Sequence, residues 1–339
     1  MIKIDLVTGF LGSGKTTFLK KYAEHLVSQG FQVGIIENDF GAVNIDMLML
    51  QDLLGDKIDV EQIVGGSVVT DWKRRFRTKL ISMAMRGFNR ILVEPSGIYD
   101  VDAFFDVLGE EPIDTWYEVG NIITILDARL EEGLSRQEEY LMVSQSANAG
   151  KIILSKVQTA KREDLFRTVA HLNRIMQEFK CPRRFLLPID SAEESKPLFK
   201  NLTAATDADP SAVLLCKAWE DFSSEDYESI SRCGFVRADH EKLWFDPKKS
   251  FSSLFFMHVK LTREELEDAL KKLLSAADLG TVFRVKGYLP MPEGDWLQIN
   301  AIPAQTILQR VPLGQEILIV IGQDLNEASI RPFFYPQNA

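Results

Sequence analysis

Cysteine and histidine are scarce in this chain, which has three cysteines and four histidines among its 339 residues. The cysteines are far apart and contain no C-x-x-C pair, so a disulfide framework is excluded and a reducing, cytoplasmic compartment is expected. The histidines are scattered, so the chain has no His-rich metal-binding loop. The sequence is therefore poor in the soft ligands that transition metals prefer.

Long apolar runs and an excess of positive charge are also lacking. No run approaches the length of a membrane span, and the first residues lack the pattern of a signal peptide, so no membrane partner is expected. The 39 Lys and Arg residues against 49 Asp and Glu residues give a net charge of −10. This balance argues against nucleic acid as a partner, because phosphates require positive charge. The hydrophobic content of 45% is typical of a globular protein, and the length suggests two domains.

The first half of the chain alternates short apolar runs with helical patterns. Because strands and helices alternate, we predict an α/β domain whose parallel sheet is covered by helices on both faces. The expected strands lie at residues 2–8, 32–37, 57–63, 90–93, 121–127, 151–155 and 184–189, and the expected helices at 15–28, 71–86 and 160–179.

The pattern changes after about residue 190. A polar, acidic stretch follows, and from residue 251 most of the apolar runs read as strands. A helix at 263–274 among five strands predicts a smaller α+β domain with an antiparallel sheet; these strands lie at 253–261, 281–288, 296–301, 306–311 and 316–321. The expected organisation is thus an α/β domain at 1–195, a connector at 196–250 and an α+β domain at 251–339.

A phosphate-binding loop follows the first expected strand. Residues 9–16 read G-F-L-G-S-G-K-T, which satisfies the G-x-x-x-x-G-K-[ST] pattern between a strand and a helix. The backbone amides of such a loop point at a phosphate, and the helix N-terminus adds a favourable dipole. We expect Lys15 to reach the β- and γ-phosphates and the Thr16 hydroxyl to bind Mg²⁺. The residues predicted here to bind the nucleotide are Gly9, Gly12, Ser13, Gly14, Lys15, Thr16 and Thr17.

Two acidic residues at the ends of other strands are candidates for the magnesium site. Asp39 follows the second strand, and Glu94 ends an apolar strand as a Walker B carboxylate does. The backbone N–H of Gly97 is placed to approach the γ-phosphate. We therefore assign Lys15, Asp39 and Glu94 to catalysis, and Thr16, Asp39 and Glu94 to the metal.

These motifs resemble those of the CobW-like P-loop GTPases. Residues 8–17, T-G-F-L-G-S-G-K-T-T, are similar to the family signature, N-D-F-G at 38–41 to its switch I, and R-V-K-G at 284–287 to a strand of its C-terminal domain. Ser155 and Lys156 stand where the family reads the base, so the resemblance places them in the nucleotide site. It implies a Mg²⁺-dependent GTPase with GTP as substrate, acting on a metalloprotein or corrinoid client.

The chain departs from the family at two motifs. Gly66, Val68 and Val69 occupy the three positions of its C-x-C-C motif, so no transition metal is expected there. Gln158 replaces the Asp of N-K-x-D, which removes a charge-assisted pair to guanine worth on the order of 2 kcal/mol. An ATP-preferring enzyme, and a nucleotide-binding switch with little turnover, are therefore kept as alternatives. Formation of a homodimer is left open.

Overall fold

The computed structural model describes residues 1–39, 50, 53–64, 69–130, 133–188, 214–244, 252–292, 294–303 and 305–336. The chain divides into two compact units. The first is built from the N-terminal residues and continues to Trp244, and the second contains the residues described from 252 onward. Within these described residues, no helix is both long and apolar enough to cross a membrane.

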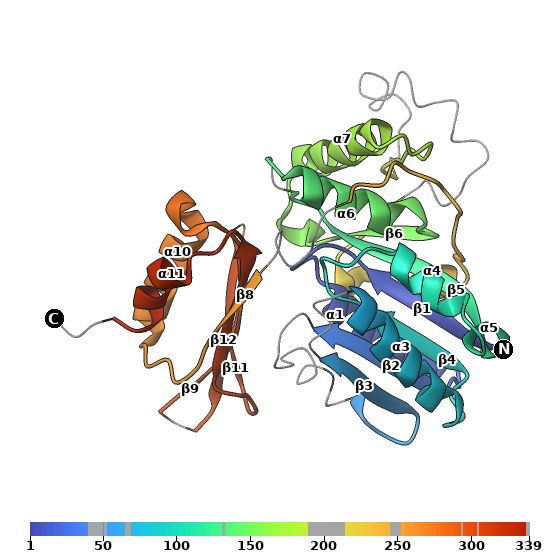
Figure 1. Cartoon of the computed structure of the whole chain (residues 1–339), viewed down its shortest axis with the longest axis horizontal. Helices are drawn as coiled ribbons and strands as arrows, with labels where there is room; N and C mark the ends of the chain where they lie inside the picture. The colour runs from blue at the N-terminus through green and yellow to red at the C-terminus, as the bar shows by residue number, and fades with distance from the viewer. Residues whose placement is uncertain are drawn as a thin grey trace. The chain divides into compact units, whose positions relative to one another are not determined.

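The first unit is built on a seven-stranded sheet in the order β3-β2-β4-β1-β5-β6-β7 (Figure 1). β1 pairs in parallel with both β4 and β5, and the pairs β2–β4, β5–β6 and β6–β7 are parallel as well. The predicted α/β domain is therefore confirmed. The strands are β1 (Ile2–Thr8), β2 (Val33–Asp39), β3 (Ile58–Val64), β4 (Arg90–Glu94), β5 (Tyr117–Asp127), β6 (Lys151–Ser155) and β7 (Leu215–Cys216).

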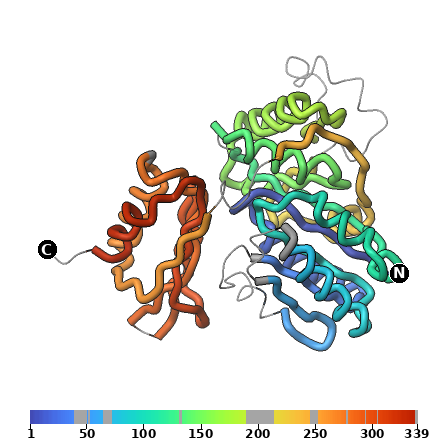
Figure 2. Tube along the Cα trace, in the orientation of Figure 1, coloured from blue at the N-terminus to red at the C-terminus, as the bar shows by residue number. Residues whose placement is uncertain are grey.

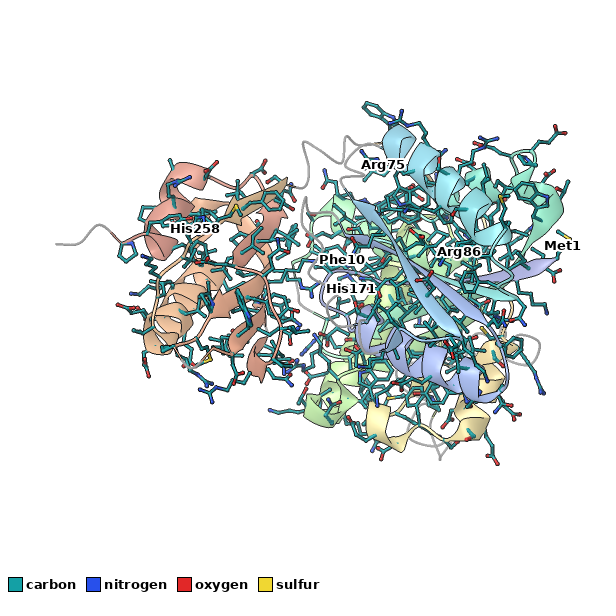
Figure 3. The ribbon with its side chains drawn as sticks, turned by 90° about the horizontal axis from the view of Figure 1, so that it is seen from below. Met1, Phe10, Arg75, Arg86, His171 and His258 are labelled. Carbon is teal, nitrogen blue, oxygen red and sulfur yellow. The ribbon has the colours of Figure 1, made fainter. Side chains whose placement is uncertain are left out.

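Helices cover both faces of this sheet. α1 contacts α8 on one face, and α3 contacts α4 on the other (Figure 3). Ten consecutive residues of α6, from Glu138 to Ala147, are buried, so this helix shows no polar stripe and was not predicted. The helices are α1 (Lys15–Ser28), α3 (Val69–Ala84), α4 (Asp102–Leu108), α5 (Ile113–Trp116), α6 (Arg136–Ala147), α7 (Arg162–Glu178) and α8 (Ser224–Ser231).

Residues 214–244 belong to the first unit, although they fall within the predicted connector. They supply β7, the 3₁₀ helix η4 (Trp219–Asp221) and α8, and then return beside α6 and α7 (Figure 2). The strand predicted at 184–189 is wrong, since the described residues 184–188 contain no strand. Instead, the Leu186 carbonyl accepts a hydrogen bond from Leu214 N at 2.9 Å. The predicted boundaries at 195 and 250 stay predictions, because both lie outside the described residues.

The second unit is an antiparallel sheet in the order β11-β10-β9-β12-β8. Helices α10 and α11 contact each other and share with the sheet a core that includes Leu266, Leu270 and Phe334. α10 begins at a capping box formed by Thr262 and Glu265. This confirms the smaller α+β domain. Its elements are β8 (Ser252–Phe256), α10 (Arg263–Ser275), β9 (Thr281–Pro290), β10 (Trp296–Ile302), β11 (Gln305–Val311), β12 (Ile317–Gln323) and α11 (Glu327–Phe334).

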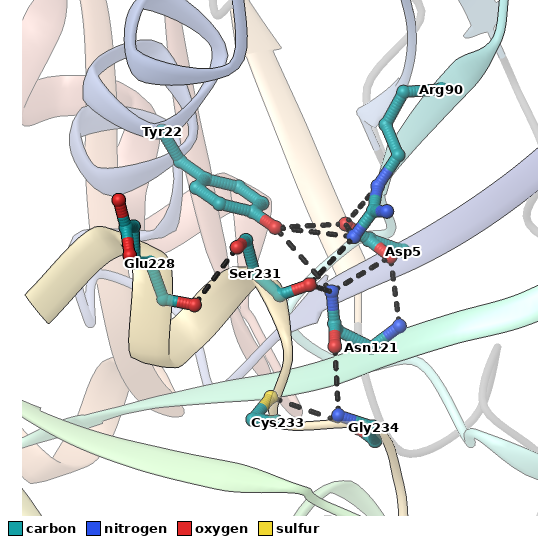
Figure 4. Close-up of polar contacts among 8 residues, drawn as sticks. All are labelled: Asp5, Tyr22, Arg90, Asn121, Glu228, Ser231, Cys233 and Gly234. Atoms are coloured by element: carbon teal, nitrogen blue, oxygen red, sulfur yellow. Dashed lines mark hydrogen bonds and ion pairs between the residues drawn. The ribbon is translucent and has the colours of Figure 1, made fainter. Parts of the chain in front are cut away.

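A buried ion pair lies inside the first unit (Figure 4). Asp5 of β1 is fully buried, and its Oδ2 accepts hydrogen bonds from Arg90 Nε of β4 at 2.8 Å and from the Tyr22 hydroxyl at 3.0 Å. Burial raises the pKa of Asp5, while the charge of Arg90 opposes that rise. The pair is therefore sensitive to the loss of either member.

Asn121 of β5 connects this pair to the chain that follows α8 (Figure 4). Its backbone N–H donates to Asp5 Oδ1 at 2.7 Å, and its side-chain Nδ2 donates to the Ser231 carbonyl at 3.0 Å. Its Oδ1 accepts from the Gly234 N–H at 2.7 Å. Both ends of one buried amide thus hold residues 231–234 against the sheet.

Candidate nucleotide-binding site

The loop between β1 and α1 has the backbone of a phosphate cradle. Gly9, Gly12 and Gly14 have φ angles of 141°, 72° and 97°, which side-chain-bearing residues rarely adopt. A Cβ atom on Gly9 would also collide with the Ile125 carbonyl of β5. The glycines of the motif are therefore required by the turn that brings the loop back to the start of α1.

Lys15 and Thr16 stand at the first turn of α1. Lys15 is only 6% exposed, and its Nζ donates to the carbonyl of Phe10, the loop residue labelled in Figure 3, at 3.3 Å. Thr16 Oγ1 donates to Glu94 Oε1 at 2.8 Å, which joins residues 78 positions apart. Glu94 is itself buried at the end of β4. The structure thus brings the Thr16 hydroxyl and the Glu94 carboxylate together, and Thr16 directly follows Lys15.

Two hydroxyl groups beside the loop are unsatisfied. Among the described residues, Thr8 Oγ1 and Ser13 Oγ are buried and have no hydrogen-bond partner. Thr8 ends β1 and Ser13 lies inside the loop. Thr17, which follows Thr16 in α1, is exposed. Buried polar atoms without partners are uncommon, and at a phosphate-binding loop they are expected where a ligand supplies the missing bonds.

Gly97 lies directly against the phosphate-binding loop. A Cβ atom on Gly97 would stand 2.5 Å from Leu11 N, so no side chain fits at this position. From the other side, Gln145 Nε2 of α6 donates to the Gly97 carbonyl at 2.9 Å and to the Tyr99 carbonyl at 3.2 Å. The segment after Glu94 is therefore held between the loop and a buried helix.

Asp39 and the altered C-x-C-C loop are not tested by the structure. Asp39 is the last residue of β2, and its side chain lies outside the described residues. The same holds for residues 65–68 and for the side chain of Val69. Elsewhere in the described chain, no group of three or more His, Cys, Asp or Glu side chains is placed to hold a metal.

Two of the histidines lie beside a single carboxylate each. His171 lies beside Glu139, with 3.5 Å between Nε2 and Oε1, and His258 lies beside Glu316, with 3.2 Å between Nδ1 and Oε2 (Figure 3). His171 and Glu139 belong to the first unit, and His258 and Glu316 belong to the second.

The predicted base-reading residues follow β6. Ser155 is buried, and its Oγ donates to the Leu126 carbonyl at 3.3 Å. Lys156 has a φ of 57°, and its Nζ donates to Asp127 Oδ2 at 2.6 Å. Gln158 is exposed. Ser155 and Lys156 therefore lie at the carboxyl edge of the sheet, the edge that carries the phosphate-binding loop.

Trp219 lies beside the phosphate-binding loop, a position that the sequence did not reveal. Its indole Cζ2 lies 3.6 Å from the position a Cβ would take on Gly14, and the same position is 3.8 Å from the Ser155 Cβ. Its ring centroid is 5.8 Å from that of Phe18 in α1. The only sequence signal for this position is an aromatic residue shortly after β7. β7 has two residues and is too short to be detected by periodicity.

Comparisons with known proteins place this site in a family. A family model described as CobW/HypB/UreG, nucleotide-binding domain, matches residues 3–185. The zinc chaperone YjiA of Escherichia coli is 26% identical over 186 residues, covering 51% of this chain and 55% of YjiA. The zinc chaperone YeiR of the same organism is 30% identical over 131 residues, covering 38% and 39%. The matched part of the chain thus spans about half, or less, of the length of these relatives.

Solved structures of related proteins were also found. The crystal structure of Zn(II)-bound YjiA GTPase from E. coli covers 100% of this chain and 99% of YjiA, at 19% identity and a TM-score of 0.34. HypB from Helicobacter pylori in complex with nickel covers 68% of this chain and 84% of HypB, at 16% identity and a TM-score of 0.38.

The family match begins in β1 and extends past β6. It therefore includes the phosphate-binding loop, the Glu94 strand and the residues Ser155 and Lys156. Residues 3–185 are also more than half of the 339 residues. On this evidence the chain belongs to the CobW/HypB/UreG family of nucleotide-binding proteins.

Proposed function

We propose that this protein binds GTP, hydrolyses it with Mg²⁺, and uses the reaction to assemble or activate a metal- or corrinoid-containing client protein. The observation that carries the proposal is the contact between Thr16 and Glu94 beside Lys15. Two oxygen ligands from distant parts of the chain meet at the mouth of a phosphate-binding loop.

The donor atoms of this pair suit magnesium. A threonine hydroxyl and a carboxylate are hard oxygen ligands, which Mg²⁺ prefers and which zinc and nickel sites use less than thiolate and imidazole. The chemistry supplied by bound Mg²⁺ would be positive charge beside the phosphate groups. Thr16 and Glu94 would hold the ion, and Asp39 stays the proposed third group, as a ligand or to orient water.

The remaining steps belong to the protein's own groups. The loop amides and Lys15 would bind the phosphates and stabilise charge as water adds to the γ-phosphorus and the bond to the β–γ bridging oxygen breaks. The bond electrons leave with the nucleoside diphosphate, and the attacking water gives up its proton to the released phosphate or to solvent. Gly97 would contact the γ-phosphate through its backbone, and Gln145 would couple that contact to α6.

A hydrolysis assay with a Glu94→Gln variant tests this proposal. We expect phosphate release from GTP in the wild type to require Mg²⁺ and to stop in EDTA. The variant should lose roughly 100-fold in turnover, because metal binding supplies several kcal/mol of charge stabilisation. Glu118→Gln, which alters an exposed glutamate of β5, is the matched control. Tight nucleotide binding without turnover in the wild type would favour the switch with little turnover instead.

The identity of the client rests on relatives that are named as zinc chaperones. Because residues 66, 68 and 69 carry no thiol, we propose that this protein acts on its client without a thiolate site of its own. Its output would then be a nucleotide-dependent interaction with the client.

Zinc titration with a chelating indicator checks this idea. The wild type should show no tight, stoichiometric Zn²⁺ or Co²⁺ site, while a Gly66→Cys, Val68→Cys, Val69→Cys triple variant should gain one, because three thiolates nearly complete a tetrahedral site. Tight wild-type binding that disappears when residues 65–70 are replaced would contradict the expectation.

A further inference from the structure

The strand order gives the nucleotide site two distinct sides. β1, which leads into the phosphate-binding loop, lies between β4 and β5. Glu94 ends β4 on one side, and Ser155 ends β6 on the other, with β7 next to it. Because Glu94 marks the end where Mg²⁺ and the γ-phosphate would lie, the sugar and base must extend toward the ends of β6 and β7.

Trp219 lies on that second side. It follows β7 by three residues, and its indole stands beside Gly14, which has the Cβ of Ser155 as another neighbour. Trp219 as a whole is half-buried, so the residue is not sealed inside the core. Phe222 supports it, with 5.3 Å between the ring centroids. An aromatic surface is thus fixed at the start of α1, next to the phosphate-binding loop.

The charges around Trp219 favour the base rather than a phosphate. Glu220 and Asp221 follow it directly and are exposed, so this segment would repel phosphate groups. Lys156, the nearest cation in sequence to Ser155, is paired with Asp127. A neutral aromatic ring is therefore the part of a nucleotide that this surface fits.

We propose that Trp219 is the surface on which the nucleotide base stacks, an inference that rests on the proposed nucleotide-binding function. Stacking on indole requires only a π-face, and a purine offers a larger one than a pyrimidine. The binding energy from Trp219 would therefore be shared by GTP and ATP. It would hold a purine in place although Gln158 lacks the carboxylate that reads guanine.

Binding titrations with four ligands test the proposal. The ligands are GTP, ATP, UTP and inorganic tripolyphosphate, each measured with Mg²⁺ by calorimetry. Trp219→Ala should weaken GTP and ATP binding by about 10-fold or more, the scale of base–aromatic stacking, and UTP binding by less. Tripolyphosphate binding should stay within about twofold, because it has no base. Trp219→Phe should retain most of the purine affinity, and Trp244→Ala, which removes a tryptophan that is 91% exposed, is the matched control.

Three outcomes would overturn the proposal. Unchanged GTP affinity in Trp219→Ala would show that the base does not use the indole. An equal loss for GTP and tripolyphosphate would show that Trp219 only supports the start of α1 through Phe18. If the wild type binds neither nucleotide nor tripolyphosphate, the proposed function fails, and this inference fails with it.

Fluorescence gives a second test that does not depend on the stability of Trp219→Ala. GTP should quench the indole emission of the wild type, and tripolyphosphate should not. The quenching should disappear in Trp219→Phe, which keeps an aromatic ring at the site. Equal quenching in the wild type and in Trp219→Phe would contradict base stacking at this residue.

Discussion

Replacing Lys15 with alanine is expected to lower the turnover of GTP by roughly 100- to 1,000-fold, the loss seen when one preorganised charge-stabilising group is removed from an active site. Lys15 is only 6% exposed at the base of the loop. A cation from the solvent therefore cannot easily replace its missing charge in the variant. Phosphate release under single-turnover conditions measures the effect on the chemical step.

Lys21→Ala is the matched control for this experiment. It removes a lysine from the same helix, six residues further from the loop, and should leave turnover within about twofold. A Lys15→Ala variant that keeps wild-type turnover would contradict the assignment of the loop as a catalytic site. Circular dichroism of both variants would establish that the total helix content is unchanged.

Replacing Arg90 with methionine is expected to destabilise the first unit by about 3–5 kcal/mol, because a fully buried Asp5 carboxylate then loses its counter-charge. Urea unfolding followed by circular dichroism measures this change. Arg86→Met, which breaks ion pairs at the surface, should cost less than about 1 kcal/mol and serves as the control. A double variant, Asp5→Asn with Arg90→Met, should recover part of the lost stability, because no charge is then left unpaired.

The loss of unfolding free energy caused by Arg90→Met should also depend on pH. Burial already raises the pKa of Asp5, and the pKa rises further when the charge of Arg90 is removed. The folded variant then binds a proton more readily than the unfolded chain, so the stability from this group falls as pH rises. The destabilisation should therefore be larger at pH 8 than at pH 5. An equal loss at both values would mean that Asp5 is not the group responsible.

Two parts of the candidate site could be predicted from the sequence because each lies at the end of one strand. The loop motif, the strand before it and the helix after it are contiguous, so their arrangement could be read directly. Glu94 could be placed because the carboxyl ends of parallel strands share one edge of a sheet, and its contact with Thr16 spans that edge. The family resemblance stated from these motifs is confirmed by the match over residues 3–185.

The parts that escaped prediction have physical reasons. α6 is buried on all sides from Glu138 onward, so no helical stripe marks it in the sequence. β7 has only two residues and lies after a long polar stretch, so neither periodicity nor length identified it. Trp219 follows β7, and its place beside Gly14 depends on that strand pairing with β6. A contact that depends on an unrecognised strand could not be predicted.

The buried amide of Asn121 determines where the polypeptide can be cut. If the chain ended near residue 195, just after the residues that the family model matches, Asn121 would lose the Ser231 carbonyl and the Gly234 N–H together. Each orphaned polar group inside a protein costs about 1–3 kcal/mol, and β6 would at the same time become an unprotected sheet edge. The shortest fragment that keeps every hydrogen bond of this amide therefore runs to residue 234 or beyond, well past residue 185, where the match to the family model ends.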